Sequence, residues 1–261
     1  MDRLYVRQAN IVFSKDFVDR VKEHSVIITR RNHFNRNGVI INHGNGKPIT
    51  IGKKAKDIYI INKPEAISKC SNKNVNCKIL KDYYPKLYDS IDSIDNYPVI
   101  VKPINGHHGY GIEVFDNEED ISNFFDTHSI GKYIIQQYID IKHEYRFNII
   151  DKEVYQTSHK MRQEGETDGG GFIFTYRSLG KDAKISQKFW DYVDNIINDF
   201  HEEVGNDLGH YCIDVMKGFD KKYYLTEINS ACGLGDFTLG KLIEELDIKY
   251  SNGDLDKYKV E

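Results

Sequence analysis

A chain of 261 residues is long enough for one large domain or two smaller ones, each with its own hydrophobic core. Its 39% hydrophobic and 12% aromatic residues exclude a disordered protein, and no apolar run is long enough to span a bilayer. The first residues lack the apolar core of a signal peptide, so we expect a cytoplasmic protein without membrane contact.

The net charge of −4 is unevenly distributed along the chain. Residues 1–81 hold 17 Lys and Arg against 6 Asp and Glu, whereas the remainder holds 19 against 34. A basic front segment suits an anionic ligand such as nucleotide phosphates, but a solvated surface that complements an acidic remainder is the commoner case. The four cysteines show no zinc-site spacing, so we expect reduced thiols without a chemical role.

The first 62 residues predict a small α/β unit of short strands, because short apolar runs alternate with polar and glycine-containing segments. Two short helices follow. Pro64 stands in the first turn of one, with Ala66, Ile67 and Cys70 facing inward, and the other covers 74–81 with Val75, Ile79 and Leu80 inward. Lys73 precedes the second helix, where backbone N–H groups help to hold an anion. The apolar runs of the first unit lie at 11–13, 26–29, 39–41 and 58–61.

From residue 97 the pattern changes mainly to strands. A helix is predicted at 118–127, capped by Asp116 or Asn117, and another over 189–204, with Gly205 at its C-terminal cap. A loop rich in Gly and Glu covers 163–171, and the chain ends in a helix over 238–246 and a polar tail. Strands are predicted at 98–103, 112–115, 133–139, 144–150, 153–161, 211–216 and 223–229.

The last two strands form a predicted hairpin that carries the candidate metal ligands. Alternation places Tyr211, Ile213 and Val215 on one side of the first strand and Asp214 on the other, while Leu225, Glu227 and Asn229 share a side of the second. With the turn centred between residues 220 and 221, Asp214 lies opposite Glu227. Facing carboxylates repel each other, so they indicate either a solvated hairpin or a bound Mg²⁺, which prefers oxygen ligands.

The glycine cluster Gly106, Gly109 and Gly111 joins two predicted strands. That position excludes a Rossmann or P-loop motif, in which the glycines connect a strand to a helix. The remaining functional interpretation is a glycine hairpin that closes over phosphates. Lys102, at the end of the preceding strand, would add a positive point charge to the same phosphates. The alternative is an ordinary turn beside a surface lysine.

Together, the segments VIVKP (99–103) with the glycine loop, YIIQQYI (133–139), HEYR (143–146) and Asp214 with Glu227 and Asn229 resemble the ATP-grasp superfamily. The resemblance is strongest to RimK-like carboxylate–amine ligases and extends from about residue 61 to 234. Agreement in order and spacing across separate segments makes it more specific than any one motif.

The resemblance implies a role for each matching residue. Lys73 and Lys102 resemble the lysines that bind nucleotide phosphates, and Gly106, Gly109 and Gly111 resemble the mobile lid. Asp214, Glu227 and Asn229 are similar to the magnesium ligands. Arg146, Lys160, Arg162 and Arg177 match cations near the transferred phosphoryl group and the substrate carboxylate. Gln136, Gln137, Tyr138 and Ile139 resemble the hinge whose backbone pairs with adenine, and Glu144 resembles the ribose-binding acid.

Three departures from the family pattern are visible. Many relatives have Glu where Gln137 stands, and some have Arg at the position of Cys212, so Lys160, Arg162 or Arg177 are our candidates to supply that cation. The front domain is also short, which leaves its contribution to the substrate pocket open.

The resemblance therefore implies an α+β ATP-grasp fold, with two α+β subdomains preceded by a short α/β domain. We assign 1–62 to the front domain, 63–132 to linker helices and the central subdomain, and 133–261 to the C-terminal subdomain. The expected cofactors are ATP and two Mg²⁺ ions, with Mn²⁺ as a substitute. The family implies homo-oligomers in many members, but no sequence feature identifies an interface.

The implied activity is an ATP-dependent carboxylate–amine ligase that acts through an acylphosphate. Its substrates would be a small molecule or peptide with a carboxylate and an amine co-substrate, with no nucleic acid. One alternative is an ATP-grasp phosphotransferase acting on a phosphorylated alcohol such as an inositol phosphate. Basic residues near the front of the chain would suit that substrate. A non-catalytic nucleotide-binding module is a second alternative. These basic residues are Arg30, Arg31, Arg36, Lys53, Lys54 and Lys56.

Overall fold

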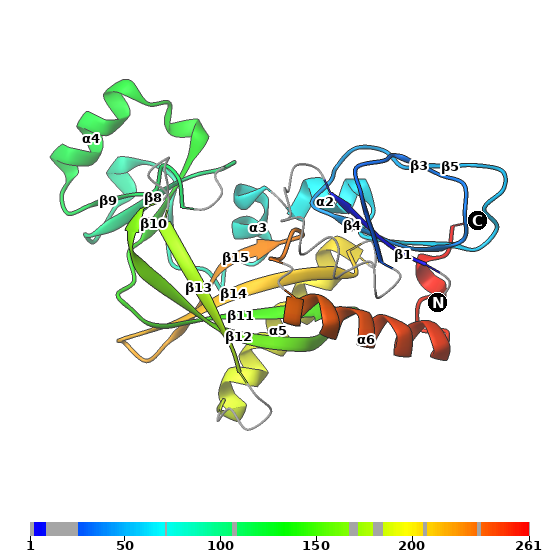
Figure 1. Ribbon diagram of the computed structural model, residues 1–261. Helices are drawn as coiled ribbons and strands as arrows, with labels where there is room; N and C mark the ends of the chain where they lie inside the picture. Colours follow the sequence, from blue (N-terminus) through cyan, green and yellow to red (C-terminus); the bar gives the residue numbers. More distant parts are fainter. Residues whose placement is uncertain are drawn as a thin grey trace.

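The computed structural model describes residues 3–8, 26–70, 72–105, 109–166, 172–179, 185–205, 208–233 and 236–260. Three larger sheets and their helices form an N-terminal unit, a central unit and a C-terminal unit, which meet around α2, α3 and β15 (Figure 1). The apolar run at 11–13 and Gly106 lie outside the described residues. No helix in the described ranges is long and apolar enough to cross a membrane.

The N-terminal unit is built on a parallel four-stranded sheet with the order β2-β1-β4-β6. Its strand β4 is buried along its whole length, which is typical of a parallel strand covered on both faces. The strands expected at 26–29, 39–41 and 58–61 are present. The bounds are β1 Leu4–Gln8, β2 Val26–Thr29, β4 Gly38–His43 and β6 Ile58–Ile61, with a small pair β3 His33–Phe34 and β5 Thr50–Ile51 beside them.

Two linker helices connect this unit to the next. In α2 (Pro64–Cys70), Ala66, Ile67 and Cys70 are buried as predicted. In α3 (Lys73–Ile79), however, the buried helical residues are Asn76 and Cys77 rather than Val75 and Ile79. The Asn76 side chain can be buried because its amide donates to the Cys70 carbonyl at 2.6 Å.

The central unit is an antiparallel sheet with the order β7-β10-β8-β9, covered by α4. The side chain of Asn117 caps α4, and Ile121 packs against Val99 and Val101 beneath it. We had assigned residues 133–137 to the C-terminal unit, but this strand pairs with β8 and lies in the central sheet. The bounds are β7 Leu87–Tyr88, η1 Ile91–Ser93, β8 Val99–Pro103, β9 Glu113–Phe115, α4 Glu118–Thr127, η2 Ile130–Lys132 and β10 Tyr133–Gln137.

The C-terminal unit is an antiparallel sheet with the order β13-β12-β11-β14-β15. One face packs on α5, whose C-terminal cap is Gly205 at a positive φ of 72°, as predicted. Strand β12 continues into the segment predicted as a loop, and β13, which we had not predicted, pairs with it. The bounds are β11 Ile141–Ile150, β12 Glu153–Glu166, β13 Phe172–Ser178, α5 Gln187–Val204, β14 His210–Gly218 and β15 Tyr223–Asn229.

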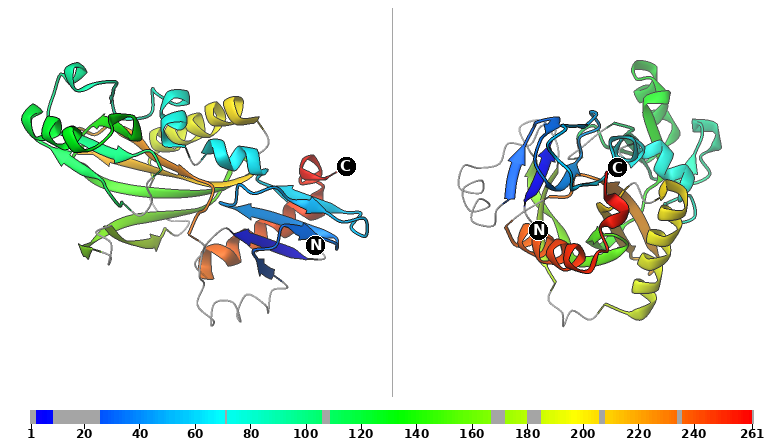
Figure 2. Two further views of the ribbon diagram at one scale, coloured as in Figure 1. Left: turned by 90° about the horizontal axis from the view of Figure 1, so that it is seen from above. Right: turned by 90° about the vertical axis from the view of Figure 1, so that its right-hand side faces the viewer.

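The last helix, α6 (Asp236–Asn252), packs between the N-terminal sheet and the C-terminal sheet, where it contacts β12. Its Leu239, Leu242 and Leu246 pack with apolar residues of β1 and β4, and with Ile150 of β11. Because Ile149 packs with the α5 core and Ile150 with α6, the two helices cover opposite faces of the C-terminal sheet (Figure 2). The predicted polar tail is ordered around η4 (Asp256–Tyr258) and returns to β6.

Candidate functional site

The hairpin β14–β15 contains a bulge that sets the geometry of the site. Val215 pairs with Leu225, but Asp214 pairs with Glu227, so Thr226 is the extra residue. The predicted pairing of Asp214 with Glu227 is confirmed, although the bulge produces it rather than a turn centred between 220 and 221. The bulge also reverses the phase of β15, so Leu225 joins the core together with Ile228. Leu225 therefore does not share a side with Glu227, contrary to our expectation.

Asp214 is fully buried and its carboxylate is held by two cations. Arg146, opposite it on β11, donates from Nε to Oδ1 and from Nη2 to Oδ2, both at 2.7 Å. Lys160 Nζ donates to Oδ2 at 2.8 Å. Burial would raise the pKa of Asp214, but Arg146 and Lys160 outweigh it and hold this pKa well below its usual range. Asp214 is therefore a carboxylate at neutral pH.

Lys160 connects Asp214 to Glu144. Its Nζ lies 2.9 Å from Glu144 Oε1, and Thr226 Oγ1 donates to the same oxygen at 3.3 Å. Burial would lower the pKa of Lys160, but the two carboxylates outweigh it and raise this pKa above the usual value. The cluster thus holds two cations and two anions, which together are electrically neutral.

Two aromatic rings of β13 lie over these cations. The Tyr176 ring centroid is 4.7 Å from Arg146 Cζ, and the Phe174 ring centroid is 4.3 Å from Lys160 Nζ. Both rings share a sheet face with the cluster, since Tyr176 pairs with Lys160 across β12 and β13. Neither ring was identified from sequence, because β13 follows a segment rich in Gly and Glu that we interpreted as a loop.

The two candidate phosphate lysines approach the same site from α3 and β8. Lys73 Nζ lies 4.0 Å from Glu227 Oε1. Burial lowers the pKa of Lys102, opposed by Cys77 and by the Glu227 and Glu144 carboxylates. The site therefore lies between the central and C-terminal sheets. We expected the backbone N–H groups at the start of α3 to help to hold an anion. The structure contradicts this expectation, because the Asn72 side chain already accepts hydrogen bonds from the N–H groups of residues 74 and 75.

The predicted lid and hinge segments occupy the central unit. Gly109 and Gly111 have positive φ values of 75° and 68°, and a Cβ on Gly111 would lie 3.0 Å from Pro103 Cγ, so this position requires glycine. In the hinge, the N–H groups of Gln137 and Tyr138 donate to the carbonyls of residues 86 and 98. These two N–H groups of the predicted hinge are therefore already used within the protein.

Gln136 is fully buried on β10. Its amide Nε2 lies 3.8 Å from Cys77 Sγ, and its Oε1 has no hydrogen-bond partner among the residues that the structure describes. A buried amide oxygen without a partner is uncommon and costs free energy. It is consistent with a contact to a ligand beside Lys102.

The two remaining candidate cations differ in position. Arg162 follows Lys160 by two residues on β12 and is exposed on the same face. Arg177 pairs with His159, whose ring stacks on Tyr145 on the α5 side of the sheet. Arg177 therefore faces away from Asp214, and we correct its assignment as a catalytic candidate.

The donor set fits a hard divalent cation that arrives with phosphate. Asp214, Glu227 and Asn229 offer carboxylate and amide oxygens, which Mg²⁺ prefers, and the remaining positions suit phosphate oxygens and water. Within the described residues, no three His, Cys, Asp or Glu side chains converge into a site that holds a metal by themselves. These residues fit a metal bound together with a nucleotide better than a metal bound alone.

Residues 54–170 match the family model of the RimK-like ATP-grasp domain. The D-alanine–D-alanine ligase from Bacillus anthracis complexed with ATP has a TM-score of 0.60 at 13% identity, covering 98% of this chain and 99% of that chain. The ATP-grasp ligase PsnB with a minimal precursor has a TM-score of 0.53 at 16% identity, covering 75% of this chain and 64% of that chain.

PsnB complexed with a phosphomimetic precursor variant, Mg and ADP has a TM-score of 0.60 at 13% identity, covering 95% and 99% of the two chains. No curated protein matches the chain. The solved structures show a shared ATP-grasp fold, which confirms the α+β class.

Proposed function

From the match of residues 54–170 to the RimK-like ATP-grasp domain, we propose that the chain is an ATP-dependent ligase that joins a carboxylate to an amine. The observation that supports this proposal is the convergence on one site of Asp214 and Glu227 from the C-terminal unit, Lys102 from the central unit and Lys73 from linker helix α3. Opposite charges arranged in this way suit a metal-bound triphosphate. The substrate is an amino acid or a peptide.

Bound MgATP would supply the phosphoryl group that converts a carboxylate into an acylphosphate, which an amine then displaces. Asp214, Glu227 and Asn229 would hold the metal, with up to two ions and with Mn²⁺ as a substitute. Lys73 and Lys102 would neutralise phosphate charge, which is the main form of catalysis in phosphoryl transfer.

Arg146 and Lys160 are positioned to serve the transferred group. Arg146 is partly buried and its guanidinium holds two oxygens of one carboxylate, which is the geometry that also suits a phosphoryl or carboxylate ligand. Lys160 supplies a second cation beside it and takes the part of the arginine that some relatives have at position 212. Gly109 and Gly111 would let the lid close over the phosphates and exclude water.

A panel assay tests the ligase. The protein is incubated with MgATP and a set of amino acids and peptides, and ADP release and product mass are measured. We expect a product whose mass equals acid plus amine minus water. Asp214→Ala and Glu227→Ala should lower the rate at least about a hundredfold, as expected for loss of a transition-state charge contact.

The panel also separates the alternatives. A product heavier by one phosphate would identify a phosphotransferase, for which the exposed basic residues at 30–56 are the supporting feature. Nucleotide binding without turnover would identify a non-catalytic module. Full activity in both carboxylate variants would reject the site.

A further inference from the structure

Strand β15 changes phase between two of its core residues. Leu225 and Ile228 both lie in the core against α5, although strict alternation places residues that are three apart on opposite faces. The extra residue Thr226 in the pairing with β14 accommodates this spacing. The apolar pattern of β15 therefore requires a bulge, and Thr226 occupies it.

The bulge determines which face of the sheet carries Glu227. Before the bulge, Val215 pairs with Leu225, and if that register continued, Glu227 would pair with Ile213. Ile213 is fully buried in the α5 core, where a carboxylate without a partner is costly in free energy. A register shift of one residue moves the following side chains to the other face. With the bulge, Glu227 instead pairs with Asp214.

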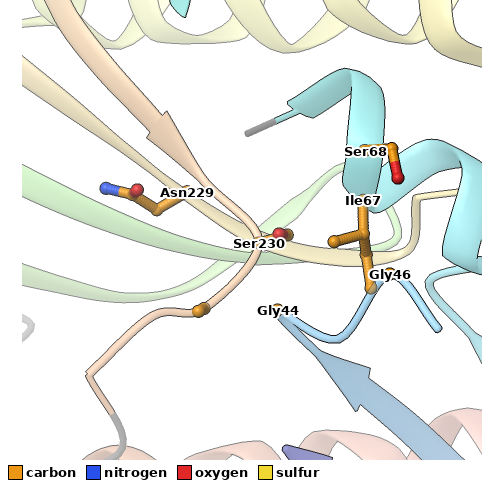
Figure 3. A pocket seen from close by; sticks show the side chains of 7 residues that line it. Gly44, Gly46, Ile67, Ser68, Asn229 and Ser230 are labelled. Atoms are coloured by element: carbon orange, nitrogen blue, oxygen red, sulfur yellow. The ribbon is translucent and has the colours of Figure 1, made fainter. Parts of the chain in front are cut away.

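The orientation of Asn229 depends on the same shift. Asn229 pairs with Cys212, whereas without the extra residue it would pair with Tyr211 in the core. It also borders an open cavity where the three units meet, and Gly44 and Ser68 line the far side (Figure 3). Figure 3 shows the Asn229 side chain pointing away from both residues. The phase of β15 therefore orients Asn229, rather than the far side of the cavity.

The Thr226 side chain connects the bulge to two neighbouring strands. Its Oγ1 lies 2.9 Å from the Asp214 carbonyl oxygen on β14 and 3.3 Å from Glu144 Oε1 on β11. A threonine hydroxyl has one proton, so it donates to one of these oxygens at a time, and the contact to the carbonyl is the shorter. Glu144 Oε1 also accepts from Lys160 Nζ at 2.9 Å. The hydroxyl thus ties the extra residue to the backbone of Asp214 and to the ion cluster around it.

We propose that Thr226 is a positioning residue for the metal–nucleotide site. Its hydroxyl holds the bulge of β15, so that Glu227 and Asn229 stay on the face of Asp214 and can share a divalent cation with it. Thr226 acts through these side chains rather than by coordination. This inference rests on the proposed function, because the shared cation belongs to that function.

The matched variants are Thr226→Val, Thr226→Ser and Thr175→Val. Valine keeps the branched shape and removes the hydroxyl, whereas serine keeps the hydroxyl. Thr175 is an exposed threonine on β13 of the same sheet, and its Oγ1 accepts from Gln163 Nε2 at 2.9 Å. The set separates loss of the Thr226 hydroxyl from a change of shape and from the general effect of replacing a hydrogen-bonded threonine.

The experiment measures metal binding and local opening. Mn²⁺ is titrated by electron paramagnetic resonance into each protein saturated with a non-hydrolysable ATP analogue, and amide hydrogen exchange of β15 is followed without nucleotide. We expect Thr226→Val to bind Mn²⁺ about fivefold more weakly than the wild type and to exchange its amides beside the bulge about fivefold faster. Thr226→Ser and Thr175→Val should stay within about twofold of the wild type. A merely structural role would lower stability and leave the Mn²⁺ affinity of the folded protein unchanged.

The outcomes distinguish this inference from the ligase itself. If folded Thr226→Val binds Mn²⁺ as tightly as the wild type, or if Thr226→Ser is as weak as Thr226→Val, the inference is wrong and the ligase stands. If Thr226→Val is weaker and Thr226→Ser is restored, but the substrate panel yields no ligated product, the inference stands and the ligase is wrong. Absence of nucleotide-dependent Mn²⁺ binding in the wild type would overturn both.

Discussion

Lys160 Nζ lies 2.8 Å from Asp214 Oδ2, so a residue that we propose as a metal ligand is already paired with a cation of the protein. Arg146 holds both oxygens of the same carboxylate. Metal binding at Asp214 must therefore weaken at least one of these contacts. A triphosphate offers Lys160 and Arg146 replacement anions, which explains why metal and nucleotide are expected to bind together.

Replacing Asp214 should destabilise the fold. Asp214→Asn leaves Arg146 and Lys160 buried without their shared anion, and removing one partner of a buried ion pair costs about 3–5 kcal/mol. Urea unfolding of the wild type and the variant measures this difference. Glu227→Gln is the control. Because Glu227 is partly exposed, this change should lower the free energy of unfolding by less than about 1 kcal/mol. Equal losses of unfolding free energy in both variants would show that the buried ion pairs of Asp214 stabilise the fold no more than the contact of Glu227 does.

Lys160→Met should strengthen metal binding without nucleotide. The change removes one positive charge from a neutral cluster and leaves Glu144 without its cation. We expect Mn²⁺ alone to bind about tenfold more tightly to the variant, which corresponds to about 1.4 kcal/mol. Electron paramagnetic resonance counts free Mn²⁺ in the titration. Lys86→Met, an exposed lysine of the central unit, is the control, and an unchanged Mn²⁺ affinity in Lys160→Met would contradict the prediction.

The affinity for nucleotide should fall as the pH rises above 7, because Lys102 loses its proton. Burial lowers the pKa of Lys102, so its ammonium loses its proton at a lower pH than an exposed lysine does. Only the protonated form attracts phosphate. Calorimetric titration of an ATP analogue between pH 7 and 10 should show the decline, and Lys102→Arg should flatten it because arginine stays charged. A decline of the same size in Lys102→Arg would assign it to another group.

Acid should destabilise the junction between the N-terminal and C-terminal units. Burial lowers the pKa of His43 to about 4 and of His210 to about 3, and His43 Nε2 lies 2.6 Å from the Cys232 carbonyl. Because the folded pKa lies below the unfolded value of 6.5, the stabilising contribution is complete above pH 6.5. It falls as the pH decreases toward 4, by up to about 1.4 kcal/mol per pH unit for each histidine.

Denaturant unfolding at pH 7, 6 and 5 measures this slope. Buried His201, with a pKa lowered by burial to about 4, contributes in every variant. His210→Asn should reduce the slope between pH 6 and 5, whereas His128→Asn, an exposed histidine, should leave it unchanged. A slope in His210→Asn equal to that of the wild type would remove His210 from the explanation.

The sequence predicted the inward faces of single strands and helices because these faces follow simple periodicities, whereas the candidate site residues came from the family resemblance. Alternation along β14 placed Tyr211, Ile213 and Val215 in the core, and the helix pattern of α2 placed Ile67 there. The relation between strands was harder to predict. A single extra residue, Thr226, moved Leu225 to the opposite face, and bulges leave no strong local pattern in a polar strand.

The same difficulty explains the error at Arg177. Its strand follows an irregular register between residues 162 and 166, so the face of each β13 residue could not be counted from Lys160. The cavity was not predictable either, because it is lined by glycines and serines from three distant segments. The pairing of Asp214 with Arg146 and Lys160 depends on contacts between three strands. The residue pattern within one strand does not predict such contacts.

Nucleotide-dependent metal binding at Glu227 tests the central claim most directly. Mn²⁺ is titrated by electron paramagnetic resonance into wild type, Glu227→Gln and the exposed control Glu65→Gln, each saturated with a non-hydrolysable ATP analogue. We predict that Glu227→Gln binds Mn²⁺ at least about tenfold more weakly than the other two proteins. Equal Mn²⁺ affinity in all three proteins would contradict a metal–nucleotide site at the β14–β15 hairpin.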